Sequence, residues 1–109
     1  MQIEDIKTIL AQTGLNSTYY SWPDKEAPQL PYLVWYMPNS INFEADNLVY
    51  KPIYSLNVEL YTRTKDFKLE RRIEAVFEQN GIVWEKTESY LTSERMYEVL
   101  YETSVIVEH

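Results

Sequence analysis

Cysteine is absent from this 109-residue chain, glycine occurs only twice and histidine once. Without cysteine there are no disulfides, no thiol nucleophile and no thiolate metal ligands. Two glycines are too few for a phosphate-cradling loop of any familiar form. The single histidine is His109, the last residue, where a truncated purification tag is as plausible as a native side chain. These absences exclude most catalytic arrangements, so we expect no enzyme activity and no catalytic, cofactor-binding or metal-binding residues.

Long apolar runs are missing as well. No segment approaches the roughly 18 apolar residues that a membrane span requires. The N-terminal segment, Met-Gln-Ile-Glu-Asp-Ile-Lys, has neither the basic start nor the continuous apolar stretch of a signal peptide. We therefore expect a soluble protein without membrane contact that is made in the cytoplasm. The length fits one domain, 1–109.

Positive charge is scarce, whereas aromatic side chains are abundant. Ten Lys and Arg against 17 Asp and Glu give a net charge of −7. Tight binding to nucleic acid is not expected, because it depends on Lys and Arg displacing counterions from phosphates. A charge of this size is also common simply for solubility. Ten Tyr and three Trp exceed what one small core easily hides, and both are favoured in protein interfaces. The composition thus favours a surface that contacts other proteins.

The segment 53–82 has the clearest periodicity. Apolar side chains at every second position from Tyr54 to Leu60 predict a strand with one buried face. The period then lengthens to that of a helix, which we place at about 66–80. The apolar stripe of this helix comprises Leu69, Ile73, Val76 and Phe77.

The sequence also predicts how this helix begins and ends and which side of it is polar. Thr64 or Asp66 can cap its first turn, and Gly81 can supply the left-handed residue that ends it. Glu70 and Glu74 lie four residues apart on the polar side. Paired carboxylates could serve acid/base chemistry, but a solvated charge ladder is much the commoner use of this pattern. We predict that both carboxylates are exposed.

The remaining elements complete an α+β pattern. An apolar stripe near the N-terminus predicts a first helix that ends near Gly14. Residues 89–95 fit either a short helical turn or the end of a long hairpin. Each helix has one apolar stripe and each strand one dominant apolar face, which predicts a mixed or antiparallel sheet of four to five strands with two helices packed on one face. The predicted strands are a short one within 15–22 and longer ones at 32–37, 48–61, 82–86 and 96–107.

The segment 38–46 stands apart because it lacks a sustained period. We predict a connection that projects between two strands, with Pro52 marking a bulge or an edge beyond it. Its acids, Glu44 and Asp46, lack the further ligands and the glycine of a calcium loop. Exposed apolar residues in such a polar connection favour a contact with another protein. The candidate interaction residues are Ile41, Phe43, Asp46 and Leu48.

Six short motifs of the chain are informative when they are taken together. They are Pro31-Tyr-Leu-Val-Trp-Tyr, Phe43-Glu-Ala-Asp46-Asn47 with Tyr50, Val58-Glu-Leu-Tyr-Thr62, Lys65-Asp66 with Leu69-Glu70, Gly81-Ile-Val-Trp84 and Met96-Tyr-Glu-Val-Leu-Tyr101-Glu. In this order they resemble the small tail-terminator, or tail-completion, proteins that join heads to tails in long-tailed phages and prophages. The resemblance spans about 30–107 and includes the first helix only by its position. Its motifs are structural and include no catalytic signature.

The resemblance implies a structural protein of the virion. Its members have helices on one face of a mixed or antiparallel sheet and form a homo-oligomeric ring, commonly a hexamer, at the head-proximal end of the tail. They stop growth of the tail tube and present a surface to the head. The implied partners are the tail tube protein and a head completion or connector protein, with DNA only passing through the channel. No catalytic residue and no cofactor is implied.

Two other functions stay open. A neck protein of the same virion, either a connector or a stopper, is similarly small and acidic. A small-molecule binding module unrelated to phages would instead be a monomer with a closed, aromatic-lined pocket. A ring-forming subunit can also be a monomer when isolated and dilute, because its contacts can depend on a tube end as template.

Overall fold

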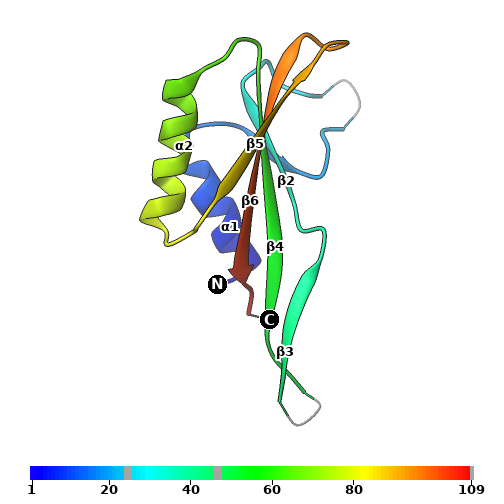
Figure 1. The fold of residues 1–109 in the computed structure, drawn as a ribbon, viewed down its shortest axis with the longest axis vertical. Coiled ribbons are helices and arrows are strands. Elements are labelled where there is room, and N and C mark those ends of the chain that lie inside the picture. The colour runs from blue at the N-terminus through cyan, green and yellow to red at the C-terminus, as the bar shows by residue number, and fades with distance from the viewer. Residues whose placement is uncertain (24–25, 46–47, 109) are drawn as a thin grey trace.

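In this computed structural model the residues described are 1–23, 26–45 and 48–108, with side chains except at 41–51. Over this part of the chain two helices lie on one face of a mixed sheet (Figure 1). The predicted α+β class, with both helices on the same face, is confirmed. The elements are α1 (Ile3–Ala11), β1 (Ser17–Tyr19), β2 (Tyr32–Tyr36), β3 (Ser40–Ala45), β4 (Leu48–Thr62), α2 (Phe67–Gln79), β5 (Glu85–Leu91) and β6 (Met96–Ile106).

The sheet is built around the 15-residue strand β4. Its strands follow the order β1-β2-β4-β6-β5, and β3 pairs with β4 off this path. The pair β1–β2 is parallel and the other pairs are antiparallel. The C-terminal part of β4 lies between β2 and β6, so its alternate side chains point to the helices or to the helix-free face.

The apolar core lies between the helices and the sheet. Ile73 and Phe77 from α2 have no exposed surface, and neither do Val58 and Leu60 from β4. Ile6 and Leu10 add the contribution of α1, as the apolar stripes predicted. Tyr97 to Val107 follow the predicted alternation, and the core side chains contributed by this last segment are Val99, Tyr101, Val105 and Val107.

The expectation of an irregular connection at 38–46 is wrong. Ser40–Ala45 forms β3, because polar and apolar residues alternate there with the period of a strand. β3 pairs antiparallel with β4, and the register shifts between Asn42 and Glu44, next to the pairing of Asn42 with Pro52. The ladder is thus irregular next to Pro52, where the sequence predicted a bulge or an edge. β6 ends opposite Ile53, so β3 and residues 48–52 extend beyond it as a two-stranded arm (Figure 1).

Different residues cap the two ends of α2. Asp66 rather than Thr64 caps the helix, since its Oδ1 accepts the Leu69 N–H at 3.0 Å. Gly81 has the predicted left-handed φ of 72°. The Ile82 N–H then donates to the Phe77 carbonyl at 2.9 Å, which closes the helix end and keeps this residue out of the sheet.

The strand predicted at 82–86 therefore begins later and runs further. β5 starts at Glu85 and continues to Leu91, and residues 92–95 turn the chain into β6. The open choice for residues 89–95 is thereby settled as a long hairpin. Arg95 has a φ of 52°, the left-handed conformation that such a turn requires.

Candidate functional site

Three of the four candidate interaction residues, Ile41, Phe43 and Leu48, belong to the arm. Ile41 and Phe43 lie in β3, and Leu48 is the first residue of β4, opposite Ala45. The pairing of β3 with β4 brings Ile41 and Phe43 into the same two-stranded arm as Leu48, which the sequence interpretation did not predict. Asp46 lies outside the described residues, and the side chains of the other three lie outside the described side chains.

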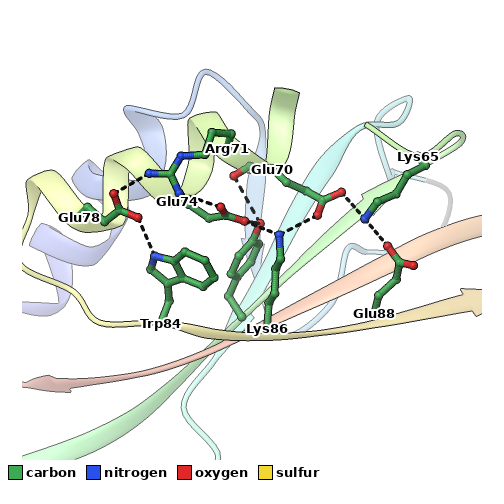
Figure 2. Close-up of polar contacts among 9 residues, drawn as sticks. Lys65, Glu70, Arg71, Glu74, Glu78, Trp84, Lys86 and Glu88 are labelled. Atoms are coloured by element: carbon green, nitrogen blue, oxygen red, sulfur yellow. Dashed lines mark hydrogen bonds and ion pairs between the residues drawn. The ribbon is translucent and has the colours of Figure 1, made fainter. Parts of the chain in front are cut away.

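A second site, which the sequence interpretation missed, lies between α2 and the β5–β6 ribbon. Glu70 and Glu74 are only 2% and 3% exposed. The prediction that they form a solvated charge ladder is therefore wrong. The physical reason is that Lys86 on β5 and Tyr101 on β6 reach the polar side of the helix and cover it (Figure 2).

The buried carboxylates are matched by donors from three other segments. Lys86 Nζ lies 3.2 Å from Glu70 Oε1 and 2.7 Å from Glu74 Oε2. Lys65, in the turn before α2, places its Nζ 2.6 Å from Glu70 Oε2 and also pairs with a β5 carboxylate. The Tyr101 hydroxyl donates to Glu74 Oε2 at 2.8 Å. These contacts tie α2 to the β5–β6 ribbon.

Arg71 extends this site to the surface. Its guanidinium donates to Glu74 Oε1 at 3.0 Å and to Glu78 Oε1 at 2.6 Å. Trp84 Nε1 donates to the other oxygen of Glu78 at 3.1 Å. Every carboxylate drawn in Figure 2 thus has at least one donor. We call the eight residues labelled in Figure 2, together with Tyr101, the ion network: Lys65, Glu70, Arg71, Glu74, Glu78, Trp84, Lys86, Glu88 and Tyr101.

The contacts in the ion network hold its titratable side chains in their ordinary protonation states and do not bring their pKa values closer to neutral pH. Burial alone would raise the pKa of Glu74, but the hydrogen bonds from Lys86, Tyr101 and Arg71 outweigh it and the pKa is lowered. The bond to Glu74 in turn raises the pKa of Lys86, and burial raises the pKa of Tyr101. A general acid or base needs a pKa near the working pH. These shifts move away from neutrality, so the network stabilises the fold and is unsuited to acid/base catalysis.

A third polar group lies on the helix-free face of the sheet. The Tyr61 hydroxyl oxygen is 2.6 Å from Glu59 Oε2 and 2.9 Å from Glu98 Oε2. A phenol carries one hydrogen and cannot donate fully to two carboxylates, so the second close contact favours a proton on a carboxyl group. Burial raises the pKa of Glu59, and the neighbouring Glu98 charge raises it further. This cluster therefore holds a proton more readily than an exposed glutamate does.

An aromatic groove adjoins this cluster on the same face. It has a volume of about 500 Å³ and is open to solvent. The ring of Tyr32 packs at 5.6 Å from that of Trp22 and at 5.5 Å from that of Tyr61, measured between ring centroids. The residues that line the groove are Tyr20, Ser21, Trp22, Ala27, Tyr32, Val34, Tyr61, Leu91, Glu94 and Met96.

The sequence carried a partial signal for these surfaces. Alternation placed Glu59 and Tyr61 on the outward side of their strand and Glu98 on that of the last strand. Their proximity depends on the register of β4 with β6, where Tyr61 pairs with Glu98. The sequence of either strand alone does not predict that register.

Two comparisons of the sequence with known proteins found no match. No protein-family model matches the sequence, and no curated protein is significantly similar to it. Within the residues described, no group of three or more His, Asp or Glu side chains is placed to hold a metal ion. No helix in that same part of the chain is long and apolar enough to cross a membrane.

Proposed function

We propose that this chain is a structural protein of a phage virion, whose copies form a ring that caps the tail tube, stops its growth and joins it to the head. The observation that carries the proposal is a sheet covered by helices on one face only, with an arm that extends past its end (Figure 1). Such a subunit offers separate surfaces to a neighbour and to a tube. The resemblance of the sequence to tail-terminator proteins supplies the particular partners.

The helix-free face has the composition of a contact surface. Tyr32, Tyr36 and Tyr61 are half-buried there, and Tyr20 beside them is 71% exposed. The Tyr20 and Tyr36 rings meet edge to face at 5.8 Å. Tyrosine suits surfaces that are wet before assembly and covered afterwards, because it combines an apolar ring with a hydroxyl. Covering this face with another subunit would bury both.

The arm supplies a second surface. Residues 48–51 have β3 as their partner strand in the described sheet, and β3 has no further strand on its outer side there. A strand edge with unpaired backbone groups can pair with another chain. A contact of this kind between unlike surfaces closes into a ring when the rotation per subunit permits it. The arm is thus suited to reach a neighbouring subunit or the tube end.

The charge of the chain is compatible with a DNA channel. A ring of copies, each carrying a net charge of −7, would present a predominantly acidic surface to passing DNA. DNA gains no affinity from such a wall, because counterion release needs Lys and Arg. A head-proximal ring through which DNA must slide benefits from that property.

Tube capping by the purified chain tests the proposal. Added to growing tubes of the tail tube protein from the same virion, the chain is expected to appear as rings on tube ends in electron micrographs and to shorten the tubes. Tubes that grow to the same length with bare ends would refute a terminator role. Rings that bind the head connector but never the tube would assign the chain to the neck instead.

The arm variant Phe43→Ser sharpens the same assay. We expect it to keep the melting temperature of the parent and to lose capping, because a contact residue acts in assembly rather than in folding. Ser40→Ala at the start of β3 is the matched control and should cap normally. If Phe43→Ser unfolds the subunit, the residue belongs to the core and the assignment of the arm is wrong.

A further inference from the structure

An exposed aromatic residue and a lysine that forms no ion pair with a described residue are adjacent at the start of α2. Phe67 is 73% exposed, slightly more than Tyr20 at 71%. Lys68 follows it, is exposed, and takes part in none of the ion pairs between described residues. The Lys65 ammonium lies 4.7 Å from the Phe67 ring centroid and holds the ring in place from one side. We call Phe67 and Lys68 the knob.

The aromatic groove on the helix-free face has the complementary features. Its walls are the rings of Trp22, Tyr32 and Tyr61, and its volume of about 500 Å³ exceeds that of a single phenylalanine side chain. Glu94 lies in its lining, and Glu98 adjoins it through the Tyr61 hydroxyl. An aromatic ring therefore finds stacking partners there, and a cation beside it finds carboxylates.

We propose that the knob of one copy docks into the groove of the next, with Phe67 between the groove rings and Lys68 paired with Glu94 or Glu98. The knob lies at the start of α2, on the side of the sheet that the helices cover (Figure 1). The groove opens on the other side. The contact is therefore between unlike surfaces and repeats from copy to copy. The inference rests on the proposed function only for the expectation that the repeat closes into a ring.

The charge of the chain indicates why a second copy would bind in the groove through this particular contact. Copies with a net charge of −7 repel one another in general, so an attractive contact needs a local reversal of sign. Lys68 and Arg72 supply it, because they lie four residues apart on α2, are exposed and form no ion pair with the described carboxylates. The carboxylates of Glu94 and Glu98 are the matching partners in a rim of mixed charge, where the Arg63 guanidinium donates to the Glu94 carbonyl at 3.2 Å. Such complementarity between individual charges sets register as well as attraction.

Zero-length coupling of amines to carboxylates tests the contact directly. An equal mixture of unlabelled and ¹⁵N-labelled full-length chain is treated with a carbodiimide at the highest soluble concentration, and the products are mapped by mass spectrometry. We expect peptides that join Lys68 of one copy to Glu94 or Glu98 of the other. Absence of both mixed-label products, while the exposed intramolecular pair Lys7–Glu4 does couple, would overturn the inference.

Substitutions separate the two halves of the contact. Phe67→Ser and Lys68→Glu should each weaken self-association by about tenfold or more, measured by sedimentation at matched concentrations. Lys68→Glu combined with the reversal of the carboxylate that couples to Lys68 in the cross-linking, Glu94→Lys or Glu98→Lys, should recover most of that loss. Val83→Ser is the control, because Val83 is 84% exposed but lies outside the knob and the groove. A control that weakens association as much as Phe67→Ser does, or a charge swap without recovery, would count against the contact.

The outcomes distinguish this inference from the proposed function. If the chain caps tubes and Phe67→Ser caps equally well, the docking of knob into groove is wrong and the terminator role stands. If the cross-links and the charge swap behave as expected but tubes are never capped, the contact stands and the terminator role fails.

Discussion

Replacing Tyr101 with phenylalanine isolates one hydrogen bond of the ion network. The Tyr101 ring has no exposed surface and packs edge to face against Phe77 and Trp84, at centroid distances of 5.4 and 5.8 Å. Those contacts survive in Tyr101→Phe, which removes only the hydroxyl. The main loss is the 2.8 Å donation to the buried carboxylate of Glu74, because the other contact of the hydroxyl, with the Glu70 carbonyl, is long at 3.4 Å. A bond to a charged acceptor contributes about 1.5–3 kcal/mol, so we expect the free energy of unfolding to fall by that amount.

Urea denaturation followed by circular dichroism at neutral pH measures this loss. Tyr90→Phe is the control, because Tyr90 is half exposed and its loss of a hydroxyl should change stability by no more than about 0.5 kcal/mol. A double-mutant cycle with Glu74→Gln should give a coupling energy of about 0.5–3 kcal/mol between the two side chains. A loss from Tyr101→Phe no larger than that of the control would refute the role given to this bond.

The pH dependence supplies an independent check. The pKa of Glu74 is lowered from its ordinary value of 4.5 in the folded protein. The stabilisation that this carboxylate contributes is therefore present above that value and is lost as the pH falls through the lower, folded pKa. The cost of Tyr101→Phe should shrink in the same acid range, because the hydroxyl then faces a neutral acceptor. A cost that is unchanged at acid pH would contradict the assignment of charge.

Three further substitutions test other parts of the fold. Ile73→Ala should lower the free energy of unfolding by about 2–5 kcal/mol, because Ile73 is fully buried, whereas Ile106→Ala at a half-exposed site should cost far less. Chemical denaturation decides this, and a loss below about 1 kcal/mol would argue against burial. Asp66→Ala removes the cap of α2 and should cost about 0.5–2 kcal/mol in the same assay. Glu59→Gln should raise the melting temperature at neutral pH, since the raised pKa of Glu59 makes its ionisation destabilising as the pH rises. That gain should vanish at acid pH, and a gain that persists there would contradict the raised pKa assigned to Glu59.

Most of the fold follows from patterns within single segments. The alternation through β4 and the change to a helical period after Asp66 identified the two largest elements, because each buries one face against the same core. The arm was missed although Ser40–Ala45 alternates, since a strand of only six residues with several polar side chains resembles a polar connection. The start of β5 was misplaced because Ile82 is apolar but serves the end of α2.

The candidate sites depended on contacts that no single segment reveals. Glu70 and Glu74 lie on the polar side of α2, and periodicity correctly separates that side from the apolar stripe. It cannot tell that Lys86 and Tyr101, more than ten residues away, cover them. The aromatic groove likewise joins side chains from β2, β4 and the β5–β6 hairpin, which only the strand order brings together.

Tail length in virions made without this chain is the most direct test of its proposed function. In the phage or prophage that encodes it, deletion of the coding sequence should give overlong tail tubes in electron micrographs, or tubes that fail to join filled heads. Supplying the chain from a plasmid should restore uniform tails, and supplying Tyr90→Phe should do the same. Tails of normal length on infectious particles after the deletion would contradict the proposal.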